Sequence, residues 1–287
     1  MKILVTGGSG FLGRRAVAWL SGLGHEVFAP DHTALDITDI SSIETSFSAH
    51  SPQAVIHCAA ISDTGKCQRE PESTALINVC GSANLAKICS RYGAKLIFCS
   101  SDQVYAGSPV PGPHCESESL SPANVYACQK LNAENECMLR CPDTVCLRLS
   151  WMYSTQFLPG EHGHLLSALS AAFQDKSLPM TWPIHDRRGI TNVDSVVKNL
   201  ASALNLPAGI YNFGSCNTMD TFHTLQSVFR ELKLESAMTR LQPNTQAFSD
   251  CPRDIRMDGT KLSQHGIVFE DTAAGLSAAL NFLMRER

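Results

Sequence analysis

Short apolar runs alternate with stretches of helical spacing along the first half of the chain. The runs are brief and end in turn residues, so they predict buried parallel strands at 2–6, 25–29, 54–60, 94–101 and 144–150. The stretches between them predict helices at 10–22, 39–49, 72–92 and 122–140. Successive strand–helix–strand units with right-handed crossovers indicate an α/β fold with a doubly wound parallel sheet, the Rossmann arrangement.

The alternation becomes less regular after residue 150. Helical spacing returns at 163–175, 189–206 and 220–234, and a strand is predicted at 209–214. We therefore expect a dinucleotide-binding domain at 1–150 and a smaller α/β substrate-binding lobe at 151–287. Segments within about 185–214 are expected to return to the main sheet.

The composition is that of an ordinary globular protein, with 44% apolar residues, 17% charged residues and a net charge of −4. The chain has no Lys/Arg-rich block, which argues against a nucleic-acid or membrane-surface partner. No run of 18 apolar residues occurs, and the opening apolar run is too short for a signal peptide. A cytoplasmic location is the default expectation.

The chain has twelve cysteines but no CxxC motif. In a long chain without a signal segment they are interpreted as small buried hydrophobes, as at Cys58, Cys80, Cys89, Cys99 and Cys146. Two spacings leave a metal-site alternative open, Cys137 with Cys141 and His162 with His164. The prediction is that the protein has no metal site.

The first strand leads into "TGGSGFLG", in which Gly7, Gly10 and Gly13 have GxxGxxG spacing. The first glycine permits a tight turn, the second lets the backbone approach a pyrophosphate, and the third allows close packing of helix on sheet. The helix that follows offers free N–H groups and a positive dipole end to phosphates. The motif follows a strand and opens a helix, so it predicts dinucleotide binding rather than an ordinary turn.

Side chains near the end of the second strand bear on the choice of cofactor. Asp31 lies where a carboxylate accepts hydrogen bonds from the adenosine ribose, which favours NAD. Arg14, Arg15 and His32 could instead hold the 2′-phosphate of NADP, so the prediction stays at NAD(P). Asp36 could contact the adenine edge or cap a turn.

The segment "NVYACQK" places Tyr126 four residues before Lys130. On a helix these side chains share a face, where an ammonium can stabilise a phenolate and make the tyrosine a better acid. Ser101 ends the fourth strand at its carboxyl end, where ligands bind in open α/β sheets. A Tyr–Lys pair alone is weak evidence and could be two surface residues, so its position after the nucleotide turn is what favours catalysis.

A series of blocks runs along nearly the whole chain: "TGGSGFLG", "ALDITD", "HCAAIS", "EPE…NVCGSANLA", "FCSSDQVYAG", "SPANVYACQKLNAE", "LRLSWMYS" and "CPRDIRMDGTKL". In this order and spacing they resemble the extended short-chain dehydrogenase/reductase superfamily, and within it the dTDP-4-dehydrorhamnose reductase family. The resemblance implies an oxidoreductase that uses NAD(P)H to reduce a 4-keto nucleotide sugar.

The resemblance also implies roles for individual residues. Tyr126, Lys130 and Ser101 match the family's catalytic residues, and Asn78 matches an asparagine that organises water near the lysine. The cofactor-binding residues that it implies are Gly7, Gly10, Phe11, Leu12, Gly13, Asp31, His32, Asp36, Ile37, Ala59, Ala60, Asn78, Ser100, Tyr126 and Lys130. The substrate-binding residues that it implies are Ser62, Asp102, Arg148, Trp151 and Arg253.

Two of these assignments have alternatives. Arg148 could pair with a substrate phosphate or with a buried carboxylate, and Trp151 could stack on the sugar or fill the lobe interface. The chain also departs from the family's pattern: His57 replaces an asparagine, and two carboxylates are missing where the sequence has Thr64, Gly65 and Gln68. Further departures are Cys251 before Pro252 and Ile190 before Thr191. They put the particular sugar in doubt more than the reaction type.

Two other functions remain open at this stage. A nucleotide-sugar epimerase or 4,6-dehydratase is one, although dehydratases tend to have Asp-Glu after the triad Thr where this chain has Asp102–Gln103. A non-catalytic, cofactor-binding regulatory subunit is the other, because the regulatory subunit of methionine adenosyltransferase resembles the same family. Members of the superfamily often pair, so a homodimer is the family-based expectation.

Overall fold

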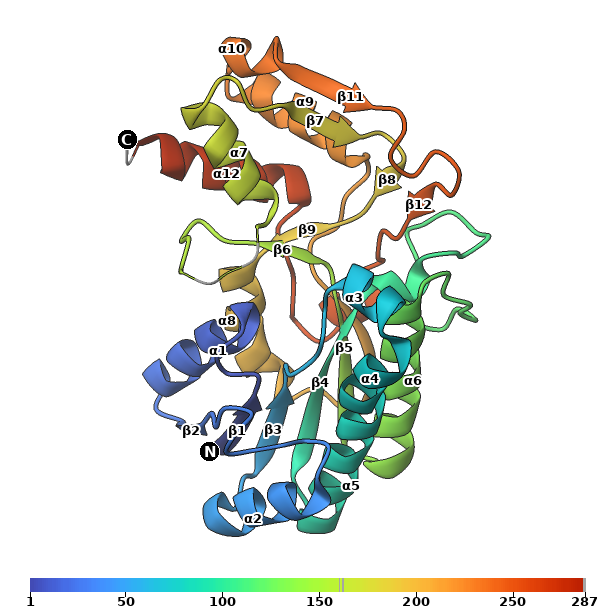
Figure 1. The fold of residues 1–287 in the computed structure, drawn as a ribbon. Helices are drawn as coiled ribbons and strands as arrows, with labels where there is room; N and C mark the ends of the chain where they lie inside the picture. The colour runs from blue at the N-terminus through green and yellow to red at the C-terminus, as the bar shows by residue number, and fades with distance from the viewer. Residues whose placement is uncertain (160, 162, 286–287) are drawn as a thin grey trace. The chain divides into compact units, whose positions relative to one another are not determined.

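The computed structural model describes residues 1–287 apart from 160, 162 and 286–287 (Figure 1). It divides into two compact units. The first contains residues Met1–Ala106, Ser119–Arg148 and Val197–Tyr211, and the second contains Gly107–Glu118, Leu149–Val196 and Asn212–Arg287. The predicted boundary at 150 differs from this division, because the segment 107–118 belongs to the second unit and the segment that returns to the first is 197–211.

A six-stranded sheet forms the centre of the first unit, in the order β10-β5-β4-β3-β1-β2. Its strands are β1 (Lys2–Thr6), β2 (Glu26–Phe28), β3 (Ala54–His57), β4 (Lys95–Ser101), β5 (Thr144–Leu149) and β10 (Gly209–Phe213). β1 pairs in parallel with both β2 and β3, and β3 with β4. The doubly wound parallel sheet is thus confirmed, and the strand order reverses between β1 and β3, where such sheets bind ligands.

Helices cover both faces of this sheet (Figure 1). They are α1 (Phe11–Gly22), α2 (Ile40–His50), α3 (Thr64–Arg69), α4 (Pro71–Ala75), η1 (Leu76–Gly81), α5 (Ser82–Tyr92), the short η2 (Asp102–Tyr105), α6 (Val125–Arg140) and α8 (Val193–Ala203). Alternate strand residues such as Leu4, Val55 and Leu96 pack against α2, α5 and α6 in one buried cluster. Trp19 of α1 and Lys198 of α8 meet in a cation–π contact of 5.8 Å.

Three predicted helices have different bounds in the structure. The stretch 72–92 is broken into α4, the π-helix η1 and α5, and Ile37 packs so closely on Gly81 of η1 that a Cβ there would lie 2.7 Å from it. α6 begins at Val125 rather than at 122, because Asn124 caps it by accepting a hydrogen bond from the N–H of Ala127 at 2.9 Å. The stretch 189–206 contains a strand before its helix.

The second unit has three parallel strand pairs: β6 (Trp151–Tyr153) with β9 (Ile190–Asn192), β7 (Met180–Pro183) with β11 (Leu241–Asn244), and β8 (Asp186–Arg187) with β12 (Arg253–Asp254). Its helices are α7 (Leu165–Gln174), α9 (Thr221–Glu231), α10 (Glu235–Met238), α11 (Thr260–Ser263) and α12 (Thr272–Arg285). Apolar faces of α7, α9 and α12 share one core. Among the described helices, none has the length and apolar character needed to span a membrane.

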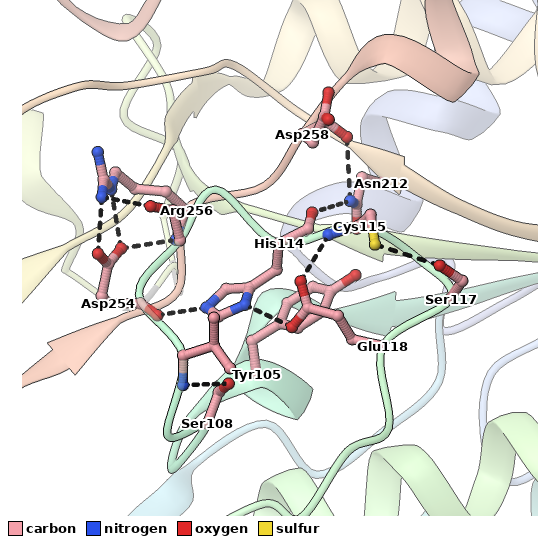
Figure 2. A network of polar contacts seen from close by, with 12 residues as sticks. Tyr105, Ser108, His114, Cys115, Ser117, Glu118, Asn212, Asp254, Arg256 and Asp258 are labelled. Atoms are coloured by element: carbon pink, nitrogen blue, oxygen red, sulfur yellow. Dashed lines mark hydrogen bonds and ion pairs between the residues drawn. The ribbon is translucent and has the colours of Figure 1, made fainter.

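A network of polar contacts fastens the segment 107–118 within the second unit (Figure 2). The buried ring of His114 lies between the Glu118 carboxylate and the carbonyl oxygen of Asp254, each 2.7 Å from a ring nitrogen. The amide of Asn212 donates to the carbonyl oxygens of His114 and Asp258 at 2.8 and 3.0 Å. Residues far apart in sequence therefore hold one proline- and glycine-rich loop in place.

Candidate active site

The glycine-rich turn lies between β1 and α1, and its glycines are required by close backbone contacts. Gly7 has a φ of +68°, and a Cβ on it would lie 2.7 Å from the backbone nitrogen of Ala59. A Cβ on Gly13 would lie 2.1 Å from the carbonyl oxygen of Gly7. No side chain caps α1 at Gly10, so its N-terminus remains available to an anion. Phe11 and Leu12 form the first turn of α1.

Two aspartates follow β2, and each closes a local turn. Asp31 Oδ1 accepts hydrogen bonds from the N–H and hydroxyl of Thr33 and the N–H of Ala34, which lower the pKa of its carboxyl group. Asp36 Oδ1 accepts from the hydroxyl and N–H of Thr38, with the same effect on its pKa. The turn role suggested for Asp36 is thus present. Asp31 and its neighbour His32 are exposed at this point.

His57 is buried and connects β1, β3 and α5. Its Nδ1 lies 2.7 Å from Thr6 Oγ1, and its Nε2 lies 2.9 Å from Ser82 Oγ. The Ser82 hydroxyl donates to the carbonyl oxygen of Asn78 at 2.7 Å, so His57 Nε2 must be the donor to Ser82. Thr6 then donates to Nδ1, which fixes a neutral imidazole. Burial, followed by the charge of Lys130, lowers the pKa of His57 to about 3.

His57→Asn is expected to flatten the acid dependence of stability. The folded-state pKa of about 3 lies below the ordinary 6.5, so the stabilisation is complete above pH 6.5 and declines as the pH falls towards 3. Wild-type protein should therefore lose about 2.5 kcal/mol more than the variant between pH 7 and pH 4.5. Urea unfolding at both pH values measures this difference. The exposed control His265→Asn should behave like wild type, and an equally steep loss in His57→Asn would refute the assignment.

Asn78 holds the segment that follows β3. Its side chain accepts a hydrogen bond from the N–H of Ile61 at 2.7 Å and donates to the carbonyl oxygen of Ile61 at 3.0 Å. It also donates to Gln129 Oε1 at 2.8 Å. The amide thereby ties the loop 59–62 to α6. The expected role in organising water stays a prediction. Gln129 was missed by the sequence analysis, since no motif marks it.

The predicted catalytic residues come from β4 and α6. Ser101 ends β4, and its Oγ accepts from the N–H of Gln103 and donates to Asp102 Oδ1, at 3.2 and 3.3 Å. Tyr126 and Lys130 lie one turn apart on α6, only 8% and 4% exposed. Lys130 Nζ donates to the carbonyl oxygen of Cys99 at 2.6 Å, and burial lowers its pKa. This contact fixes the lysine side chain at the carboxyl end of β4, because Cys99 lies two residues before Ser101 on that strand.

Arg148 and Ser100, which were predicted to bind ligands, both contact the buried carboxylate of Glu134. Arg148 is 2% exposed, and its guanidinium donates to Glu134 at 2.8 and 3.0 Å and to the Tyr105 hydroxyl at 2.8 Å. Ser100 donates to the same carboxylate at 2.5 Å. The buried-carboxylate alternative for Arg148 is thus present, and the Ser100 side chain serves the same carboxylate. The roles of Arg148 toward substrate and of Ser100 toward cofactor stay predictions. Burial opposes the charge of Arg148, but Glu134 raises the pKa of its guanidinium.

Trp151 and Arg253 lie in the second unit. The Trp151 ring packs against the core of that unit, with the Arg188 guanidinium 5.4 Å from its centroid. Arg253 donates to Asp186 Oδ1 at 2.8 Å and lies 4.1 Å above the Phe248 ring. Their roles toward a substrate stay predictions.

Among the described residues, no group of three or more His, Cys, Asp or Glu side chains has a metal-binding arrangement. Cys137 and Cys141 are buried, and each directs its thiol to a backbone carbonyl, that of Ser82 or Ala94. His164 caps α7 by accepting from the N–H of Ser167. His162 lies outside the described residues.

Comparison with known proteins gives a family and several relatives. The family described as "RmlD substrate binding domain" matches residues 1–284. The chain is 28% identical to the spore coat polysaccharide biosynthesis protein SpsK of Bacillus subtilis over 83% of this chain and 81% of that protein. It is 35% identical to the dTDP-4-dehydrorhamnose reductase of Streptomyces griseus over 52% of this chain. That match spans only 49% of the reductase, about half of its length.

Two further matches cover nearly the whole chain. Methionine adenosyltransferase 2 subunit beta of Xenopus tropicalis is 27% identical over 93% of this chain and 83% of that protein. The crystal structure of dTDP-4-dehydrorhamnose reductase from Bacillus anthracis in complex with NADP aligns with a TM-score of 0.82 and 19% identity, covering 100% of this chain and 98% of that one. This structural likeness supports the fold.

Proposed function

The chain belongs to the RmlD substrate binding domain family, and from this premise we propose that it is an NAD(P)H-dependent oxidoreductase that reduces a 4-keto nucleotide sugar. One observation carries the proposal: the buried Lys130 side chain donates to the carbonyl oxygen of Cys99 near the carboxyl end of β4. Lys130 lies one helical turn after Tyr126, and Cys99 lies two residues before Ser101. Relatives named dTDP-4-dehydrorhamnose reductase support the substrate class.

The residues of the first unit fit a dinucleotide. Gly7 and Gly13 leave no room for side chains, and α1 presents an N-terminus without a side-chain cap to the phosphates. Asp31 uses only Oδ1 in its three turn contacts, which leaves Oδ2 for a ribose hydroxyl. A reduced nicotinamide nucleotide supplies the hydride for such a reaction.

Three side chains deliver the proton that the reaction needs. Tyr126 donates its phenolic proton to the substrate oxygen as negative charge develops there. A free tyrosine has a pKa of about 10 and is a weak acid near neutrality, but the Lys130 ammonium favours the phenolate that remains. When its hydroxyl turns from Asp102 Oδ1 to the substrate, Ser101 donates a hydrogen bond to the same oxygen and helps to orient it.

The direct test incubates the purified chain with NADPH or NADH and a panel of 4-keto sugar nucleotides. Loss of nicotinamide absorbance with at least one sugar supports the proposal. If no sugar is reduced although the cofactor binds, a regulatory role becomes the better proposal. The full-length likeness to methionine adenosyltransferase 2 subunit beta is the observation that favours this second candidate.

Gly13→Ala is expected to impair nucleotide binding, because its Cβ would overlap the Gly7 carbonyl oxygen. The overlap forces the turn to shift, at a cost of about 1–3 kcal/mol in stability. Gly22→Ala, at the other end of α1, meets no atom within 4 Å and should bind nucleotide normally while gaining about 0.4–1 kcal/mol. Fluorescence titration with NADPH and thermal unfolding measure both effects. Equal affinities in the two variants would contradict the phosphate-turn assignment.

The proposal includes a homodimer in the cytoplasm. Leu76 of η1 and Leu139 of α6 are 57% and 75% exposed and lie on two helices that contact each other in the first unit. A contact between copies at these helices would cover both exposed leucines. Size-exclusion chromatography with light scattering tests the dimer, and a monomer at micromolar concentration would oppose it.

A further inference from the structure

Two cysteines face each other at the carboxyl edge of the sheet. Cys58 follows β3 and Cys99 lies near the end of β4, and their sulfur atoms are 3.6 Å apart. The register of these parallel strands pairs His57 with Phe98, so Cys58 and Cys99 are the next neighbours across the sheet. Adjacent strands lie about 4.8 Å apart, within the Cα separation that a disulfide bridges. Neither Cys58 nor Cys99 is in a disulfide.

This pair lies between two parts of the candidate active site. The backbone of Cys58 and Ala59 supports the phosphate turn, since a Cβ on Gly7 would lie 2.9 Å from the carbonyl carbon of Cys58. The carbonyl oxygen of Cys99 holds Lys130 Nζ at 2.6 Å. A change in the position of either cysteine backbone is therefore transmitted to the nucleotide turn or to the lysine.

We propose that Cys58 and Cys99 form an oxidation site, at which hydrogen peroxide converts the two thiols to an intramolecular disulfide that weakens nucleotide binding and turnover. Cys58 is partly exposed and provides access, whereas Cys99 is 5% exposed. The effect on nucleotide and turnover rests on the proposed function. Formation of the disulfide does not.

Hydrogen peroxide is the two-electron oxidant for this disulfide. One thiolate attacks a peroxide oxygen, so an S–O bond forms, the O–O bond breaks, and hydroxide leaves as water with the thiol proton. The second thiol attacks the sulfenyl sulfur, an S–S bond forms, the S–O bond breaks, and a second water leaves. Two thiols lose two electrons in total and one peroxide gains them. The sulfur atoms close from 3.6 Å to about 2.05 Å.

Electrostatics at the pair shift the pKa values of the two thiols in opposite directions. The hydrogen bond from Cys58 lowers the pKa of the Cys99 thiol, and the Lys130 ammonium acts in the same direction despite burial. The same hydrogen bond raises the pKa of Cys58, which therefore keeps its proton. A thiol with a lowered pKa beside a second thiol that can resolve its sulfenic acid is the arrangement found at redox-sensitive cysteines. In a reducing compartment such a disulfide is transient.

The test treats the intact protein with hydrogen peroxide, maps disulfides by mass spectrometry and titrates NADPH binding before and after dithiothreitol. We expect a Cys58–Cys99 disulfide, nucleotide affinity weaker by on the order of tenfold, and recovery on reduction. Cys58→Ser and Cys99→Ser should each abolish the response. Cys128→Ser, which removes an exposed thiol of α6, should retain it.

Either of two results would overturn the proposal: Cys58 and Cys99 remaining as thiols while other cysteines oxidise, or a mapped Cys58–Cys99 disulfide with unchanged nucleotide affinity. Failure of the proposed function is a separate result, because the reduced protein would then oxidise no cofactor with any 4-keto sugar nucleotide, whether or not peroxide forms the disulfide. Disulfide mapping and the nucleotide titration use wild-type protein, so both results can be obtained even if a cysteine variant fails to fold.

Discussion

Tyr126→Phe is expected to lower kcat by about 10²–10⁴-fold while nucleotide affinity stays close to that of wild type. The substitution removes only the phenolic hydroxyl from a side chain that is buried on α6, one turn before Lys130. Its ring volume is retained, so packing and the phosphate turn are preserved. The proton that the alkoxide needs is lost, and water cannot be positioned as well as a fixed phenol.

Steady-state kinetics with an accepted 4-keto sugar nucleotide and a separate NADPH titration measure the two expectations. The control is Tyr92→Phe on α5, where the ring is 44% exposed and packs beside Phe47. This variant should turn over at the wild-type rate. If Tyr126→Phe also retained turnover, the assignment of Tyr126 as the proton donor would fail.

Glu134→Gln is expected to lower the free energy of unfolding by about 3–5 kcal/mol. The carboxylate is fully buried and accepts hydrogen bonds from Arg148 and Ser100. Glutamine preserves the shape but leaves the Arg148 guanidinium as an uncompensated charge that is 2% exposed. The loss comes mainly from that stranded charge rather than from the value of the ion pair itself.

A matched control lies two residues away on the same helix. Glu136 pairs with Arg140 at the surface of α6, so Glu136→Gln should change stability by less than about 1 kcal/mol. Urea unfolding of both variants at neutral pH makes the comparison. Equal midpoints for Glu134→Gln and Glu136→Gln would show that the buried pair does not contribute in the way its geometry suggests.

Local spacing was sufficient for the fold class and for the predicted catalytic helix. Strand and helix periods, the glycines of the phosphate turn and the i, i+4 spacing of Tyr126 and Lys130 are all properties of short segments. A short segment determines these features by itself, because the backbone geometry of a helix or strand fixes which of its side chains lie on the same face. The start of this helix was less certain: the spacing predicts it from 122, and the structure begins it at Val125 with Asn124 as its cap.

The sequence by itself therefore determined the alternation of elements, the nucleotide turn and the pairing of Tyr126 with Lys130 on one helix face. Only the tertiary structure decided which polar side chains serve the protein and which are left for a ligand. Arg148 donates hydrogen bonds to Glu134 on α6, and the His57 ring forms hydrogen bonds with Thr6 and Ser82 on other elements. A buried polar group must be paired, and its partner is set by which elements meet in the core. The hydrophobic periodicity of a segment does not indicate which other elements pack against it.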